Sequence, residues 1–128
     1  VLALAGKRVE VTGYVDDDEL ARRYARTRVA VVPLRYGAGI KGKVVEALQQ
    51  GVPLVTTSVG VQGLDGLDEV AAIHDAPAAM AAAIVRLLDD DAAWRRHSHE
   101  GARYAAALFS RAALRQQMEA AMTAGNPA

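Results

Sequence analysis

The sequence predicts an α/β fold in which a parallel sheet carries helices on both faces. Three observations predict it: short runs of apolar, β-branched residues, amphipathic stretches between those runs, and a glycine-rich turn that leads from one run into a helix. Strands that alternate with helices lie parallel, because each helix carries the chain back to the same end of the sheet. The predicted strands are residues 9–15, 28–34, 52–57 and 70–73.

The first predicted strand leads into an acidic segment, residues 16–19, that opens a helix. Three aspartates after a strand can bind a metal or accept a phosphoryl group. Carboxylates at an N-cap and in a first turn also satisfy free backbone N–H groups and the positive end of the helix without any ligand. We therefore interpret this segment as a capped helix start. The apolar face of the helix would contain Leu20, Ala21, Tyr24 and Ala25.

The centre of the chain reads as strand, turn, helix and strand. Residues 29–32 form an uninterrupted apolar run, which predicts a strand buried on both faces, and Pro33 ends it. A loop at residues 35–39 leads into a helix at residues 41–50, which Gly51 stops. Such a unit places backbone N–H groups and a positive helix end at the carboxyl edge of the sheet, where a phosphate is favoured. The apolar face of this helix would contain Val44, Val45, Ala47 and Leu48.

Two short motifs match the glycine loop, and each lacks a residue that its chemistry needs. Residues 37–42 satisfy the dinucleotide pattern G-x-G-x-x-G, which expects an acidic residue about 20 positions later to hold a ribose. The sequence has Thr56, Thr57 and Ser58 in that region instead. The loop also fits P-loop spacing as far as Lys43, but Val44 stands where Ser or Thr would bind Mg²⁺. We interpret both matches as coincidental.

Residues 77–124 are rich in alanine and predict three helices. Pro77 suits the first position of one helix, and Ser110 can cap another. The apolar stripes would be Met80, Ile84, Leu87 and Leu88 in the first helix, Trp94, Gly101, Tyr104 and Leu108 in the second, and Leu114, Met118 and Met122 in the third. Stripes of this kind are usually core, so we expect them to be buried. Residues 125–127 predict a disordered end.

The composition excludes several classes of partner and site. In 128 residues, 15 basic and 15 acidic side chains give a net charge of zero, so no overall field attracts nucleic acid. The absence of cysteine excludes disulfides and thiolate metal sites, and suits a cytoplasmic location. The three histidines, His74, His97 and His99, show no metal-ligand spacing, and no nucleophile triad is recognisable. We assign no metal site and no catalytic residue.

Four segments follow one another at a specific spacing: residues 11–17, 33–48, 51–57 and 60–64. Taken together they resemble the donor-binding domain of retaining GT-B glycosyltransferases, the glycosyl transferases group 1 family. The resemblance extends over about residues 9–110. It implies a Rossmann-like partial C-terminal domain of the GT-B type that lacks its first strands, with residues 1–110 binding the donor and residues 111–128 forming a C-terminal helix and tail.

The resemblance implies that this domain binds a nucleotide-diphosphate sugar and takes part in moving the sugar to a glycan, lipid or other acceptor, without a cofactor. The candidate binding residues are Gly37, Gly39, Ile40, Lys41, Lys43, Glu46 and Thr57. The backbone N–H groups of residues 39–41 would face phosphate, with Lys41 or Lys43 as a cation, because the leaving diphosphate gains charge as the glycosidic bond breaks. Arg35 and Tyr36 could reach the same ligand, and Tyr36 could equally cover the sheet edge. Weaker candidates are Thr56 and the loop at residues 60–64.

The Glu46 carboxylate would accept hydrogen bonds from the ribose diol. In the family a second glutamate stands eight positions earlier, beside the donor sugar, and this chain has Ala38 there. The contact with the sugar therefore differs from the usual family pattern. The alternative interpretation is a non-catalytic nucleotide-binding or interaction module with a Rossmann-like fold, in which Ala38 marks the loss of chemistry.

The expected partners follow from the same resemblance. A nucleotide sugar would bind this domain, and an N-terminal domain or a second chain would complete the sheet, so we expect the isolated chain to be inactive. Two further possibilities stay open: that the protein forms a homo-oligomer, and that its acceptor is associated with a membrane. A membrane-associated acceptor would place a cytoplasmic protein peripherally at the inner membrane. No nucleic-acid partner is expected.

Overall fold

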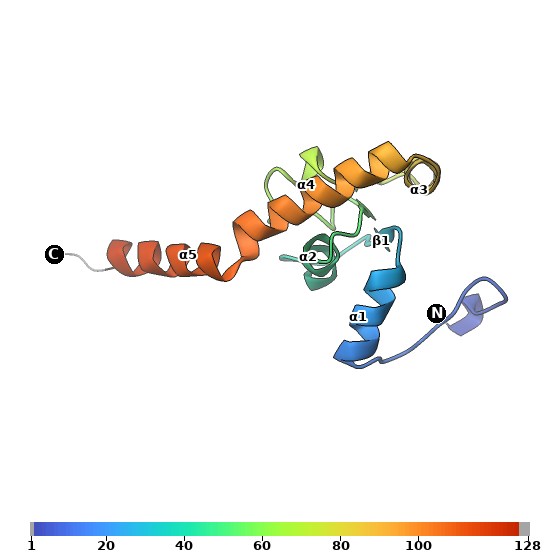
Figure 1. Ribbon diagram of the computed structural model, residues 1–128, viewed down its shortest axis with the longest axis horizontal. Helices are drawn as coiled ribbons and strands as arrows, with labels where there is room; N and C mark the ends of the chain where they lie inside the picture. Colours follow the sequence, from blue (N-terminus) through green and yellow to red (C-terminus); the bar gives the residue numbers. More distant parts are fainter. Residues whose placement is uncertain (1, 126–128) are drawn as a thin grey trace.

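A three-stranded parallel sheet lies between helices on its two faces (Figure 1). The computed structural model describes residues 2–125. The strands β1 (Ala30–Val32), β2 (Leu54–Thr56) and β3 (Ala72–Ile73) lie in the order β1-β2-β3. Val31 pairs with Val55, and Thr56 pairs with Ile73. The predicted class, a parallel sheet with helices on both faces, is confirmed.

Within residues 2–125, five helices and two short 3₁₀ turns surround or extend the sheet. They are α1 (Asp17–Arg26), α2 (Gly42–Gln49), α3 (Pro77–Asp89), α4 (Asp91–Phe109) and α5 (Arg111–Ala124), with the turns η1 (Leu2–Leu4) and η2 (Leu67–Glu69). Helices α2 and α4 pack against each other, and α3 packs against β2 and β3. The chain therefore uses α2 to cover one face of the sheet and α3 to cover the other.

The core divides into two clusters because side chains alternate across a strand. Val32 and Leu54 join Val44 and Leu48 of α2 on one face of the sheet. Val55 joins Leu87 of α3 on the opposite face, together with Ala93. All three residues of the central strand β2 are buried, as expected for a strand with neighbours on both sides and helices on both faces.

The edge strand β1 is less buried than its apolar sequence predicts. Val31 is 40% exposed, whereas Val32 beside it is 6% exposed. Helix α3 packs mainly against β2 and β3, so it does not cover the face of β1 to which Val31 points. The prediction of burial on both faces is therefore wrong for β1.

The strand predicted at residues 9–15 does not form. Within residues 2–125, backbone pairing near this segment is limited to a single antiparallel bridge between Gly6 and Val9, and Tyr14 is 95% exposed. A strand needs a neighbour to satisfy its N–H and C=O groups, and Figure 1 shows this blue segment apart from the sheet. Arg23 of α1 instead donates two hydrogen bonds to the Glu10 carboxylate, at 2.8 and 3.2 Å.

The predicted helix ends are confirmed. The Asp16 carboxylate accepts a hydrogen bond from the Glu19 N–H at 2.8 Å, which supports capping as the role of the acidic segment. The Ser110 hydroxyl accepts a hydrogen bond from the Ala113 N–H at 3.0 Å and caps α5 in the same way. Pro77 begins α3, and Gly51 follows α2 with a φ of 69°, a left-handed conformation that glycine adopts without strain.

The apolar stripe of α5 is exposed, contrary to expectation. Leu114, Met118 and Met122 are 48%, 65% and 72% exposed. Figure 1 shows α5 extending away from the sheet, with α4 as the helix it contacts, so no layer covers its stripe. The disordered end predicted at residues 125–127 lies outside the described residues except for Gly125, whose N–H donates to the Ala121 carbonyl at 2.9 Å.

Candidate functional site

The carboxyl ends of the three strands meet at one edge of the sheet and surround a hollow of about 450 Å³. This volume lies within the range of small-molecule sites, and the carboxyl edge is where open α/β sheets bind ligands. Leu34 and Arg35 follow β1, residues 57–59 follow β2, and Asp75 follows β3. The full lining is Leu34, Arg35, Thr57, Ser58, Val59 and Asp75.

The glycine loop between β1 and α2 is open to solvent. Residues 35–40 are all exposed. Gly37 and Gly39 have φ values of 133° and 76°, so both positions favour glycine. A Cβ at Gly39 would meet nothing within 4 Å. The loop is therefore shaped by its backbone conformation and is not closed by neighbouring side chains.

Helix α2 begins at this loop without a side-chain cap. Its N-cap residue is Lys41, whose side chain makes no capping hydrogen bond, whereas Asp16, Asp90 and Ser110 cap α1, α4 and α5. The first N–H groups of a helix have no partner within the helix, and they carry its positive end. An anion placed here would find donors that a carboxylate or hydroxyl satisfies in α1, α4 and α5. Helix α3 also lacks a side-chain cap, but it begins with Pro77, whose nitrogen has no hydrogen to donate.

The two lysines at this helix start are arranged differently. The Lys41 ammonium donates a hydrogen bond to the Gly39 carbonyl at 2.6 Å, and its side chain lies beside Gly37, so it follows the loop. Lys43 is exposed, and in residues 2–125 no ion pair involves it. Both cations remain available to a ligand bound at the loop.

Glu46 lies one turn further into α2 and is half-buried. The Tyr24 hydroxyl of α1 donates a hydrogen bond to its Oε2 at 3.2 Å. Burial, together with the charge and hydrogen bond of Glu46, raises the pKa of Tyr24 to about 12. The apolar pattern of α1 predicts Tyr24 as a packing residue and says nothing of Glu46, because no spacing rule links residues on two different helices.

Thr57 and Thr56 use their hydroxyls inside the fold. The Thr57 hydroxyl donates to the Leu34 carbonyl at 2.5 Å and accepts from the Gly60 N–H at 3.3 Å. The Thr56 hydroxyl donates to the Val32 carbonyl at 2.8 Å. Both side chains therefore tie the end of β2 to the chain around the end of β1. The ligand contact predicted for Thr57 stays a prediction.

Ser58 and Asp75 belong to the hollow but are absent from the predicted site. The backbone N–H and the hydroxyl of Ser58 both donate to Asp75 Oδ1, at 2.9 and 3.0 Å. These two hydrogen bonds hold the pKa of the Asp75 carboxyl below its ordinary value. The position of each residue just after a predicted parallel strand is the sequence signal that would have found them.

The loop at residues 60–64 touches the glycine loop. A Cβ at Gly63 would lie 2.9 Å from Cγ1 of Ile40, so glycine allows the two loops to approach. Ile40 is nevertheless 52% exposed. The candidate residues Gly37, Gly39, Ile40, Lys41 and Lys43 thus lie in the loop after β1 and at the start of α2, and Thr57 follows β2, whereas Glu46 lies one turn further along α2.

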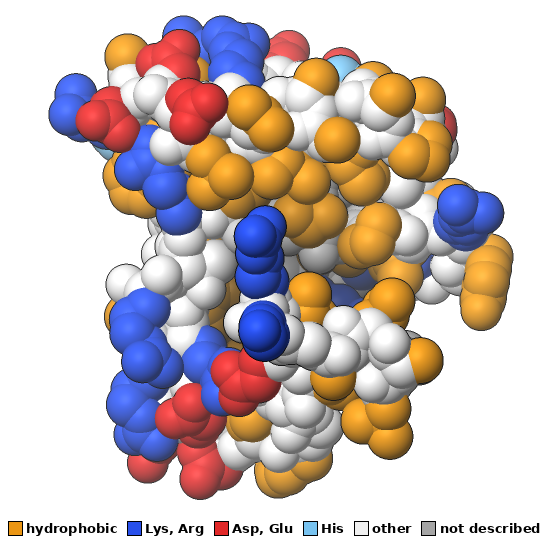
Figure 2. Space-filling view, turned by 90° about the vertical axis from the view of Figure 1, so that its right-hand side faces the viewer, with side chains coloured by type: hydrophobic (Ala, Val, Ile, Leu, Met, Phe, Trp, Pro, Cys, Tyr) orange, Lys and Arg blue, Asp and Glu red, His pale blue; other side chains and the backbone are white. Residues whose placement is uncertain are grey.

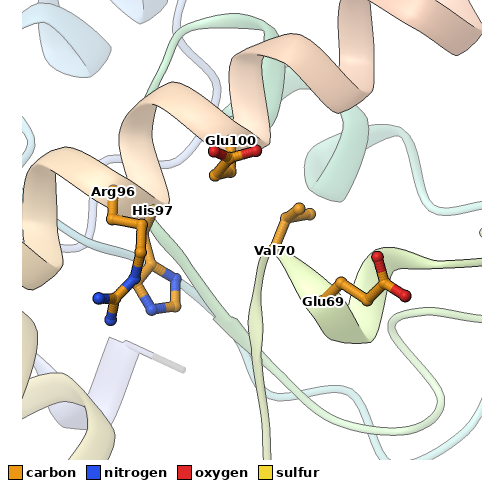
Figure 3. Close-up of a pocket in the computed structure, with 5 residues that line it drawn as sticks. All are labelled: Glu69, Val70, Arg96, His97 and Glu100. Atoms are coloured by element: carbon orange, nitrogen blue, oxygen red, sulfur yellow. The ribbon is translucent and has the colours of Figure 1, made fainter.

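A second hollow, drawn in Figure 3, is unsuited to a nucleotide-sized ligand. Its volume is about 50 Å³, and it lies between α4 and the end of η2. Burial lowers the pKa of His97, and the Glu69 carboxylate points away from that ring. The residues that line it are Glu69, Val70, Arg96, His97 and Glu100. Residues 2–125 contain no group of three or more His, Cys, Asp or Glu side chains placed to hold a metal ion.

The face drawn in Figure 2 has no large patch of side chains of one charge. Acidic and basic side chains lie next to one another at its upper left and lower left, and apolar side chains lie mainly toward its centre and right. This mixture agrees with the net charge of zero. No helix within residues 2–125 has both the length and the apolar character that a membrane crossing requires.

Comparison with known proteins gives one family match. Searches of curated proteins and of solved structures each gave no significant match. The family model described as "Glycosyl transferases group 1" matches residues 2–90, which includes the sheet, the glycine loop and α2. The chain therefore belongs to the glycosyl transferases group 1 family, and its general role is in glycosyl transfer.

Proposed function

We propose that this chain is the donor-binding part of a retaining GT-B glycosyltransferase and that it binds the nucleoside diphosphate of a nucleotide sugar. The observation that carries the proposal is the exposed, uncapped start of α2 behind a glycine loop at the carboxyl edge of the sheet. Free N–H groups, the positive helix end and the two lysines Lys41 and Lys43 suit a diphosphate there. The same groups would stabilise the negative charge that grows on the diphosphate as the sugar leaves.

The rest of the nucleotide would bind beside the diphosphate. Glu46 is one turn from the helix start and has acceptor capacity beyond its bond to Tyr24, so its carboxylate can take hydrogen bonds from a ribose diol. The hollow behind Leu34 contains the negative charge of Asp75, which disfavours phosphate at that point. An uncharged base fits this hollow better, with Arg35 at its rim.

Ala38 favours a second candidate function. The residue is exposed in the glycine loop, and it supplies no carboxylate where the family pattern has one. A chain that keeps the diphosphate site and lacks the sugar contact would be a nucleotide-binding module without transfer activity. In both proposals we expect these 128 residues by themselves to be inactive, because transfer needs an acceptor and a second domain that faces the donor site.

Titration calorimetry of the full chain with UDP and with GDP tests the proposal. We expect one of them to bind, and we expect Glu46→Gln to weaken that binding about tenfold or more, because a hydrogen bond to a charged group contributes about 1.5–3 kcal/mol. Glu119→Gln on the exposed part of α5 removes the same charge far from the site and should leave the affinity unchanged.

Two outcomes separate the candidate functions. Binding of free diphosphate, followed by donor hydrolysis or transfer once the chain is joined to an acceptor domain, would support the transferase. Binding without either reaction would support the module. If neither UDP nor GDP binds the chain, both nucleotide proposals are wrong.

A further inference from the structure

We propose that Tyr24 is a positioning residue that orients the Glu46 carboxylate toward a ribose, an inference that rests on the proposed function. Tyr24 belongs to α1 and Glu46 to α2, so the contact joins two helices that precede and follow β1. The contact would make α1 a support for the ligand-binding carboxylate.

The Tyr24 ring is held by packing, which leaves its hydroxyl a defined direction. The side chain is half-buried and packs against the cluster that contains Val32 and Leu54 of the sheet. From that position its hydroxyl reaches Oε2 of Glu46 at 3.2 Å. A carboxylate has two oxygens with about four acceptor positions, so this bond leaves capacity for another partner.

A carboxylate whose orientation is already fixed binds a diol more tightly than one that rotates freely. The two hydroxyls of a ribose are held by the sugar ring, and a carboxylate receives both only when its plane is correctly turned. An unsupported glutamate loses rotamer freedom when it makes these bonds, whereas one already held by a neighbour loses less. A tyrosine hydroxyl is protonated at neutral pH, and burial and Glu46 raise the pKa of Tyr24 further, so it stays a donor to the carboxylate.

The substitution Tyr24→Phe keeps the packed ring and removes the hydroxyl alone. We measure its affinity by calorimetry on the full chain for UDP and GDP, and for their 2′,3′-dideoxy forms, which lack the ribose diol. For the diphosphate that the unsubstituted chain binds, we expect a loss of about three- to tenfold, with less than about twofold change for the dideoxy form. Tyr14→Phe is the matched control, because Tyr14 is 95% exposed, and it should change neither affinity.

The dependence on the diol distinguishes positioning from a general structural effect. An equal loss for the dideoxy form, or no loss for either form, overturns the role of Tyr24 and leaves the proposed function standing. Absence of binding by the unsubstituted chain overturns both proposals. A second measurement needs no nucleotide. NMR titration should give a lower pKa for Tyr24 in Glu46→Gln than in the unsubstituted chain, because burial and Glu46 both raise this pKa and the substitution removes the charge of Glu46. Equal values in the two proteins would show that the contact does not exist in solution.

Discussion

Two glycine-bearing loops leave the same edge of the sheet, and they use glycine for different reasons. The loop after β1 is exposed at residues 35–40, and its glycines adopt positive φ values with open space at Gly39. The loop after β2 is crowded. A Cβ at Gly60 would lie 1.9 Å from Oγ1 of Thr56, which is closer than any two such atoms can approach.

The crowded loop is fastened at several points. Thr57 joins it to Leu34 and to the Gly60 N–H, and Ser58 joins it to Asp75 after β3. The open loop has one such internal bond, from Lys41 to the Gly39 carbonyl, among the side-chain hydrogen bonds of residues 2–125. One loop is thus organised by packing, and the other leaves its helix start available to a ligand. Glycine spacing alone does not distinguish the two situations.

The largest effect on stability should come from filling the crowded loop. Gly60→Ala forces the new methyl group against Thr56 and breaks the bond from Thr56 to the Val32 carbonyl. We expect a loss of about 2–4 kcal/mol in the free energy of unfolding, measured by urea denaturation. Gly6→Ala is the control, since a Cβ at Gly6 meets nothing within 4 Å. Equal stability of both variants would show that the loop is not packed as described.

At the open loop, adding a capping side chain to the start of α2 should raise the stability of the protein. Lys41 has N-cap backbone angles, φ −93° and ψ 115°, close to those of Asp90, φ −106° and ψ 101°, which caps α4. Lys41→Asp should therefore satisfy the free N–H groups of α2 and raise the free energy of unfolding by about 0.5–1 kcal/mol. The same carboxylate should repel a diphosphate and weaken its binding by about tenfold or more.

The control for this substitution is Lys7→Asp, which makes the same charge change in the exposed N-terminal segment. Urea denaturation and calorimetry on both variants separate the two effects. If Lys41→Asp binds diphosphate as well as the Lys7→Asp control does, the start of α2 is not the anion site. If it lowers stability, the helix start is not uncapped in solution.

The smallest effect concerns the pH dependence of the fastened loop. The backbone and hydroxyl of Ser58 lower the pKa of Asp75, so the ionised carboxylate is favoured in the folded state. The resulting stability is present above the ordinary carboxyl pKa of about 3.9 and is lost as the pH falls through the lowered value. Asp75→Asn keeps an acceptor for Ser58 but cannot titrate there. Its free energy of unfolding should fall less steeply than that of the unsubstituted chain at acid pH, and identical slopes would contradict the contact.

Much of the secondary structure was predictable because its signals are local. Asp16 and Ser110 satisfy N–H groups three residues away, and the glycine after α2 ends it whatever surrounds it. The candidate loop and the helix behind it were predictable for the same reason. The strand at residues 9–15 was not, because a strand exists only where another chain segment pairs with it. The prediction that the apolar stripe of α5 is buried was wrong for an equivalent reason, because burial requires another layer of the protein to cover the stripe.

The sequence by itself determined the order of α1 to α5 and β1 to β3, the helix ends and the position of the glycine loop before α2, because these depend on residues within a few positions of one another. Only the tertiary structure decided which glycines are crowded, that Tyr24 meets Glu46, and that Ser58 meets Asp75 across 17 residues. These contacts depend on how strands and helices stack in space. Spacing along the chain carries no information about atoms that packing alone brings together.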